Sequence, residues 1–144
     1  MGAEKIVVVG AGSASFGSGV IQGLLAHPDL AGIRIHLHDV DERALDAASR
    51  YARRLAVGTD RSIEAGTDRA AALDGADVVI LSVAMDREAT WRLDRGLGRA
   101  SGIEHYAENG GPGALFHTGR NLALLLPILR DMESRCPGAW LINY

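Results

Sequence analysis

The stretch "VVVGAGSASFGSG", residues 7–19, decides the fold. A β-branched apolar run ends at Gly10, a glycine-rich turn follows, and the apolar pattern of residues 15–26 is typical of a helix. Gly10 and Gly12 have the spacing of a dinucleotide-binding fingerprint, whereas Ser15 occupies the position of its third glycine. Because that position mainly needs a small side chain for close packing of helix and strand, we expect the turn to keep its nucleotide site.

The turn is predicted to bind the pyrophosphate of a dinucleotide. Gly12 lets the backbone approach the phosphates, and the amides of Ser13, Ala14 and Ser15 are expected near the start of the following helix. Orphan N–H groups and the helix dipole at such a position favour an anion. We include the next residue, Phe16, among the cofactor-binding residues. The alternative is a glycine turn that serves packing alone.

The second predicted strand is "IRIHLHD", residues 33–39, in which apolar and polar side chains alternate. It ends at Asp39, whose carboxylate can accept hydrogen bonds from a ribose diol and would repel a 2′-phosphate. NAD is therefore predicted rather than NADP. The rival role for this acid, the N-cap of a helix expected at 42–57, suits Asp41 better. The two histidines of the strand are predicted to face solvent or a helix and to bind no ligand.

The rest of the chain alternates predicted strands and helices. Further strands are expected at 61–66, 76–84 and 139–144, and further helices at 69–73 and 118–135. This alternation predicts an α/β fold, a Rossmann-type doubly wound parallel sheet of about five strands in the order 3-2-1-4-5. Val83, near the end of the fourth strand, and Asn143, at the end of the fifth, are predicted to line the cofactor pocket. The glycine-rich stretch 95–113 is predicted to form a long functional loop.

Composition and charge exclude several classes of protein. The 144 residues, 47% hydrophobic and 23% charged, are ordinary for one soluble globular domain. With a net charge of −3 and no basic runs, neither nucleic acid nor a membrane surface is a predicted partner. A lone cysteine, Cys136, excludes an internal disulfide framework and a cysteine-based metal cage. No targeting segment is apparent, so a cytoplasmic protein is expected.

Six segments, in order along the chain, together resemble glycoside hydrolase family 4, the NAD- and divalent-metal-dependent glycosidases. The segments are "KIVVVGAGSASF", "HDVDERAL", "GADVVILSV", "WRLDRGLGRASGI", "ENGGPGALFHTGRN" and "DMESRCPGAWLINY". The fourth resembles a family segment that usually ends in Ile-Pro-Leu-Lys-Tyr-Gly. Asp94 and Gly102 match it, whereas Gly98, Arg99 and Ala100 stand where the family commonly has Pro, Leu and Lys.

The resemblance implies an enzyme that hydrolyses O-glycosyl bonds without the usual pair of flanking carboxylates. In that family, bound NAD transiently takes a hydride from C3 of the sugar, which acidifies the C2 proton. A base removes that proton, the glycosidic bond breaks by elimination, water adds, and the hydride returns. A divalent metal such as Mn²⁺ polarises the C3 oxygen and stabilises the enediolate. The implied partner is a sugar or glycoside.

The same resemblance suggests substrate contacts for Asp94 and Arg120, the alternative for Arg120 being an ordinary arginine on the helix surface. Asn109 is expected to bind a sugar hydroxyl if the glycine-rich loop returns over the carboxyl edge of the sheet, the alternative being a solvated turn. The family's metal ligands and base lie beyond Tyr144, so no catalytic or metal-binding residue is predicted within residues 1–144. The chain is expected to be an NAD-binding domain truncated within or after its fifth strand. Its C-terminal substrate and metal domain is expected to be absent, and the piece alone is expected to be inactive.

Two other functions remain open on the sequence alone. One is the NAD domain of a lactate/malate-type dehydrogenase, which would need a catalytic histidine and arginines that the sequence does not show. The other is a stand-alone, non-catalytic NAD-binding module. Residues 122–129 are all apolar, which predicts a helix buried on more than one side. We therefore expect a homo-oligomer formed through this helix and the strand edge at 141–144.

Overall fold

The computed structural model describes residues 4–104 and 110–144. The chain divides into two compact units. The sheet unit comprises Met1–Ser82 and Asp131–Tyr144, and the helical unit comprises Val83–Arg130. Within the described ranges, no helix is both long and apolar enough to cross a membrane.

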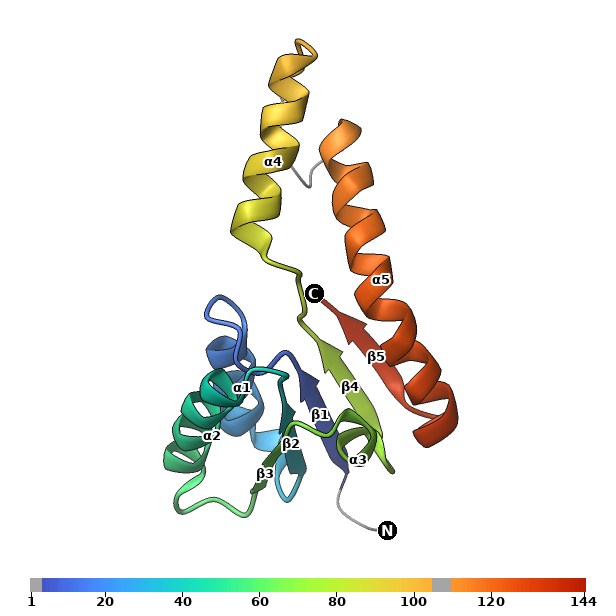
Figure 1. Cartoon of the computed structure of the whole chain (residues 1–144). Helices are drawn as coiled ribbons and strands as arrows, with labels where there is room; N and C mark the ends of the chain where they lie inside the picture. Colours follow the sequence, from blue (N-terminus) through green and yellow to red (C-terminus); the bar gives the residue numbers. More distant parts are fainter. Residues whose placement is uncertain (1–3, 105–109) are drawn as a thin grey trace. The chain divides into compact units, whose positions relative to one another are not determined.

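The sheet unit contains five parallel strands in the order β3-β2-β1-β4-β5 (Figure 1). The strands are β1 (Lys5–Val9), β2 (Arg34–His38), β3 (Ser62–Gly66), β4 (Val78–Leu81) and β5 (Trp140–Asn143). The predicted fold class and strand order are confirmed. From β1 the chain moves outward to β2 and β3, then returns to β4 on the other side of β1. That reversal makes the carboxyl ends of β1 and β4 the switch point, where open α/β sheets bind ligands.

Helices connect the strands, as the alternating pattern predicts. The sheet unit holds α1 (Gly17–Ala26), the short 3-10 helix η1 (Pro28–Leu30), α2 (Glu42–Ala56) and α3 (Arg69–Leu73). The helical unit holds α4 (Arg87–Ala100) and most of α5 (Gly111–Arg135), whose last residues belong to the sheet unit.

Burial in the core accounts for the unbroken apolar run at residues 6–9 of the first strand. Successive side chains of a strand point to opposite faces of the sheet, and all five residues of β1 are buried. Ile6 and Val8 join one cluster with α1 and α2, while Val7 and Val9 are buried on the other face. Strands of parallel sheets are typically covered on both faces in this way.

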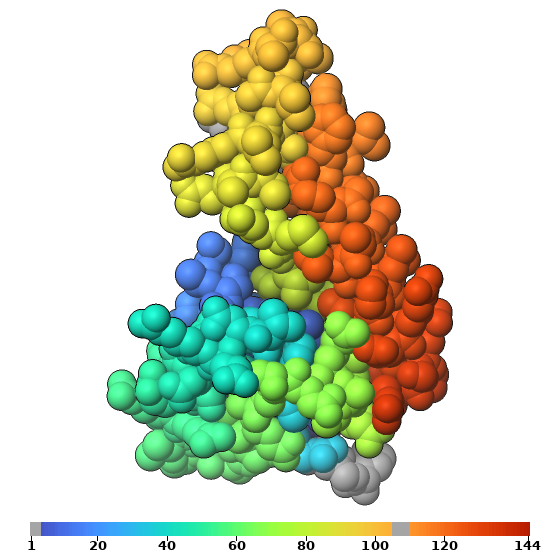
Figure 2. Space-filling view, viewed as in Figure 1, coloured from blue at the N-terminus to red at the C-terminus, as the bar shows by residue number. Residues whose placement is uncertain are grey.

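Helix α2 shows how the outer layer is built. Its buried residues, Leu45, Ser49 and Ala52, recur at helical spacing, so one stripe of the helix faces inward. Its charged side chains, among them Arg50 and Arg53, are exposed. Figure 2 shows the segment of α2, coloured teal, on the surface of the chain. The helix therefore separates a solvated side from the core.

Several boundaries differ from the sequence predictions; β4, for example, is Val78–Leu81 rather than 76–84. Helix α1 begins at Gly17 rather than Ser15, and α5 begins at Gly111 rather than at 118. The loop expected at 95–113 is wrong at both ends, because α4, a helix that the sequence analysis does not predict, continues to Ala100, and α5 begins at Gly111. Glycine in a helix costs only about 1 kcal/mol relative to alanine, so the glycines of this stretch do not by themselves stop a helix.

Candidate functional site

The glycine-rich turn after β1 is anchored on the neighbouring strand. The amides of Gly10 and Ala11 both donate to the carbonyl oxygen of His38, at 2.9 and 3.1 Å. The amide of Ser13 donates to the carbonyl oxygen of Gly10 at 3.0 Å, which closes the turn. Gly10 has φ 85°, a conformation that favours glycine. The turn is thus held by two hydrogen bonds to β2 and by one within the turn.

Two amides of the turn are left for an anion. Within the described part of the chain, the backbone N–H groups of Ala14 and Ser15 have no acceptor. The third amide expected to bind phosphate, that of Ser13, is already used, and the Ser13 hydroxyl accepts from the amide of Phe16 at 3.3 Å. The N-terminus of the ten-residue helix α1 also lacks a side-chain cap. Unpaired N–H groups in a turn that leads into a helix fit a phosphate group.

Asp39 lies at the carboxyl end of β2, where the sequence places the ribose contact. One carboxylate oxygen, Oδ2, accepts from the amide of Gly12 at 2.8 Å, and Oδ1 accepts from the amide of Asp41 at 3.0 Å. Each oxygen keeps a free lone pair, because an ionised carboxylate has about four acceptor sites. The carboxylate is therefore oriented by the backbone and can still accept hydroxyl groups.

Gly12 must be glycine for a reason that this geometry makes explicit. A Cβ atom added there would lie 2.5 Å from Cβ of Ala44 and 2.9 Å from Oδ2 of Asp39. The cap predicted for the next helix is confirmed, because Oδ1 of Asp41 accepts from the amides of Arg43 and Ala44 at 2.9 and 3.0 Å. Turn, acid and α2 thus pack directly on one another.

The structure corrects the packing role expected of Ser15 and gives it to Gly17. Ser15 is exposed, whereas Gly17 is buried at the first residue of α1. A Cβ atom on Gly17 would lie 2.1 Å from the carbonyl oxygen of Ala11, closer than real contacts allow. Gly17 therefore permits the close approach of helix and turn. Its sequence signal is a glycine two positions beyond the fingerprint, which the standard spacing ignores.

The predicted pocket residues at the ends of β4 and β5 fall in different units. Asn143 is the last residue of β5, pairs in register with Leu81 and is exposed. Tyr144 follows it and its ring contacts that of Phe16, with centroids 5.8 Å apart. Val83 is partly buried and begins the helical unit.

The two histidines of β2 are bound to neighbouring strand residues. His38 is 2% exposed, and its Nδ1 lies 3.1 Å from the carbonyl oxygen of Gly66; because a carbonyl only accepts, Nδ1 carries the proton. Nδ1 of His36 lies 3.3 Å from the carboxylate of Glu64. Burial, with a smaller effect of Lys5, lowers the pKa of His36, although Glu64 opposes the shift. Among the described residues, no group of three or more potential ligands could hold a metal ion.

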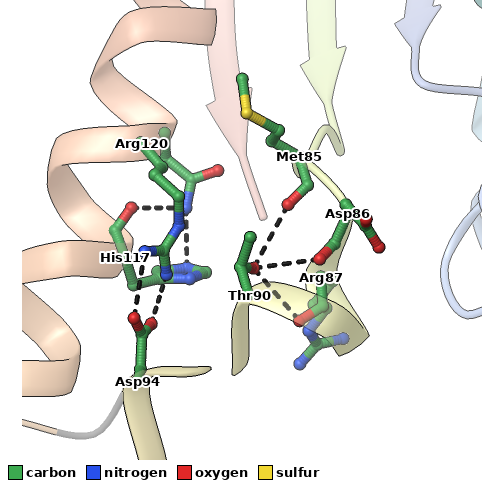
Figure 3. A network of polar contacts seen from close by, with 8 residues as sticks. Met85, Asp86, Arg87, Thr90, Asp94, His117 and Arg120 are labelled. Carbon is green, nitrogen blue, oxygen red and sulfur yellow. Dashed lines mark hydrogen bonds and ion pairs between the residues drawn. The ribbon is translucent and has the colours of Figure 1, made fainter. Parts of the chain in front are cut away.

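The helical unit brings together two of the predicted substrate residues, 26 positions apart (Figure 3). Both guanidinium nitrogens Nη1 and Nη2 of Arg120 on α5 donate to the carboxylate of Asp94 on α4. Asp94 is almost fully buried and Arg120 is a quarter exposed. The hydrogen bonds that Arg120 donates to Asp94 raise the pKa of Arg120. The third predicted contact, Asn109, lies outside the described residues.

This pairing changes what the two side chains can do. The carboxylate of Asp94 is buried and accepts both hydrogen bonds from Arg120, so it holds the guanidinium group in position. Arg120 has five N–H donors and keeps some of them beyond the carboxylate. Asn121 follows Arg120 on α5. Its Nδ2 donates to Nε2 of His117 at 2.8 Å and to the backbone carbonyl oxygen of His117 at 3.0 Å. His117 is therefore engaged within its own helix.

The first turn of α4 carries a strained residue that sequence reasoning missed. Asp86 has φ 37°, and among the described residues no other non-glycine residue has a positive φ. The Thr90 hydroxyl lies 3.3, 3.0 and 3.3 Å from the carbonyl oxygens of Met85, Asp86 and Arg87 (Figure 3). Thr90 thus stabilises the bend that leads into α4. No motif marks Asp86, because aspartate tolerates this conformation only somewhat better than other residues.

Comparison with known proteins decides the family. The sequence model described as "Family 4 glycosyl hydrolase" matches residues 5–144. The chain belongs to glycosyl hydrolase family 4. An alpha-glucosidase of Erwinia rhapontici is 42% identical to this family 4 chain over 146 aligned residues, which cover 99% of the chain and 32% of the relative. The chain thus spans about a third of the length of the curated relatives it matches.

Solved structures confirm the fold. The 6-phospho-beta-glucosidase of Thermotoga maritima, determined with manganese, NAD⁺ and glucose-6-phosphate, has a TM-score of 0.85 at 20% identity and covers 97% of this family 4 chain and 34% of its own. Malate dehydrogenase of Plasmodium falciparum has a TM-score of 0.66 at 15% identity and covers 98% of this chain and 36% of its own. At such low identities the likenesses show a shared fold alone.

Proposed function

We propose that this chain is the NAD-binding portion of a family 4 glycosidase. The observation that carries the proposal is the pairing of two features at one sheet edge. The unpaired amides of Ala14 and Ser15 lie in the turn just before α1, and the oriented carboxylate of Asp39 lies at the end of the adjacent strand. The first feature suits a pyrophosphate and the second a ribose diol.

Each residue of the site would do a defined part of the binding. The turn amides would hold the pyrophosphate, and Asp39 would accept the adenosine ribose hydroxyls and disfavour a 2′-phosphate. Asn143, exposed at the end of β5, would contact the nicotinamide half, and so would Val83. When bound, NAD supplies the transient oxidation at sugar C3 that family resemblance implies for O-glycosyl bond cleavage.

The sugar would be contacted from the helical unit. We assign a phosphate or carboxylate on the substrate to the remaining N–H donors of Arg120, which Asp94 holds in position. Asn109 is retained as a second sugar contact because of its predicted place in the glycine-rich loop. The base, the divalent metal and its ligands would lie in the part of the family protein that this chain does not span, so the chain alone would be inactive. We also keep the sequence predictions of a cytoplasmic homo-oligomer.

The cofactor assignment is tested by titrating the wild-type chain and Asp39→Ala with NADH and with NADPH. Binding is measured by the fluorescence of the reduced nicotinamide ring, which both dinucleotides carry. Wild type should prefer NADH by about tenfold or more, which corresponds to ~1.4 kcal/mol. Asp39→Ala should bind NADH more weakly and lose most of the preference. The control is Asp46→Ala, which removes an equal charge from an exposed ion pair with Arg50 on α2. Equal affinity of wild type for both dinucleotides would contradict the ribose assignment.

A further inference from the structure

Two aromatic rings meet at the carboxyl edge of the sheet from opposite ends of the chain. Phe16 precedes α1 and Tyr144 follows β5; their ring centroids are 5.8 Å apart and the ring planes are inclined by 41°. Phe16 is 41% exposed and Tyr144 is 66% exposed. The contact therefore lies on the surface, where both rings can still touch a further molecule.

The backbone holds both residues close to the switch point. The amide of Tyr144 donates to the carbonyl oxygen of Leu81, the last residue of β4, at 3.0 Å. The amide of Phe16 donates to the Ser13 hydroxyl of the glycine-rich turn at 3.3 Å. Since β4 lies between β1 and β5, the two rings approach each other from the strands on either side of β4. Figure 1 shows the end of β5 beside the end of β4.

The position of this aromatic pair relates it to one half of the proposed dinucleotide. If the pyrophosphate lies at Ala14 and Ser15 and the adenosine ribose at Asp39 on β2, the other half extends away from β2, toward β4 and β5. That half ends in the nicotinamide ring. An aromatic contact of this kind contributes roughly two- to tenfold in affinity.

We propose that Phe16 and Tyr144 form an aromatic wall that contacts the nicotinamide ring, with Tyr144 as its specificity-determining residue. The inference rests on the proposed binding of NAD and adds to it a side chain that reads the nicotinamide end. ADP-ribose has the same adenosine, pyrophosphate and second ribose but no nicotinamide. Tyr144 should therefore distinguish NADH from ADP-ribose.

The test is to titrate the full 144-residue chain with NADH and with ADP-ribose by isothermal titration calorimetry. The variants are Tyr144→Ala, which removes the ring, and Tyr144→Phe, which keeps it. Trp140→Ala is the matched control, because it removes another exposed aromatic side chain from the other end of β5. Tyr144→Ala should weaken NADH about fivefold and leave ADP-ribose within about twofold of wild type. Tyr144→Phe and Trp140→Ala should bind both ligands like wild type.

The possible outcomes separate this inference from the proposed function. Equal losses of NADH and ADP-ribose in Tyr144→Ala would show a structural role and overturn the inference, as would no loss of either. Both results would leave the NAD site intact as long as wild type binds the two ligands. A wild-type chain that binds neither ligand would overturn the proposed function and this inference together.

Discussion

Replacing Gly17 with alanine tests whether close packing of α1 on the glycine-rich turn holds the site together. The added Cβ atom would lie 2.1 Å from the carbonyl oxygen and 3.0 Å from the carbonyl carbon of Ala11. Both are backbone atoms, so no side chain can rotate away. To reach an ordinary contact, the start of α1 must move by about 1 Å, and overpacking of this kind costs ~1–3 kcal/mol.

Two assays should report the movement of α1 in Gly17→Ala. Urea denaturation should show a free energy of unfolding lower by ~2–3 kcal/mol than that of wild type. This is the upper part of the range for overpacking, because backbone atoms must shift. In a chain of this size that corresponds to a melting temperature lower by about 5–10 °C. NADH affinity should fall as well, because the amides of Ala14 and Ser15 lie in the segment that α1 displaces.

Gly19→Ala, two residues further along the same helix, is the matched control. A Cβ atom on Gly19 meets no atom within 4 Å. Alanine there should raise the free energy of unfolding by about 0.5–1 kcal/mol, because glycine is the weaker helix former. The reasoning would be refuted if Gly17→Ala were as stable as wild type or were stabilised like Gly19→Ala.

Three further predictions concern other parts of the chain. Asp94→Asn should loosen the helical unit, because Arg120 loses its charged partner; amide hydrogen exchange in α4 should become faster, and unchanged exchange would contradict the pairing. Burial lowers the pKa of His36 below its ordinary value of 6.5, so the unfolded chain takes up the proton first as pH falls. The free energy of unfolding should thus decrease as pH falls from 6.5 toward the lowered pKa. In urea denaturation, His36→Asn should lose less of this free energy than wild type between pH 7.5 and 5.5. Equal losses in the two proteins would contradict the role given to His36. The chain should elute as a dimer or larger species in size-exclusion chromatography with light scattering, because Leu122, Leu126 and the residues of β5 are exposed; a monomer at every concentration would contradict this.

The sheet could be predicted from sequence because each of its strands carries a local signal. The β-branched run before Gly10 and the apolar residues of β4 show burial on both faces, and their order follows from the alternation with helices. The position of Asp39 at the end of β2 could be predicted for the same reason, and its role as a ribose contact stays a prediction. The N-cap role could be assigned to Asp41 rather than Asp39, because Asp41 directly precedes α2, and its hydrogen bonds to the first turn of α2 confirm this.

The rest depends on contacts between residues far apart in the sequence. Nothing local shows that Gly17 meets the Ala11 carbonyl, because the contact depends on how α1 leaves the turn. The pairing of Asp94 with Arg120 could not be predicted either, since the two residues lie on different helices. Helix α4 is not predicted, because its glycines lower the helix propensity of the segment. Ion pairs such as that of Glu88 with Arg92 stabilise the helix, but they form only once the helix is folded.

The most direct test of the central claim is to map NAD⁺ binding on the wild-type chain by amide chemical shifts in ¹H–¹⁵N NMR spectra. A dinucleotide with its pyrophosphate on the glycine-rich turn should shift the free amides of Ala14 and Ser15 most strongly, together with amides next to Asp39. Amides of β3 at the far edge of the sheet should change little. Shifts that avoid the turn, or the absence of any saturable shift, would contradict the account.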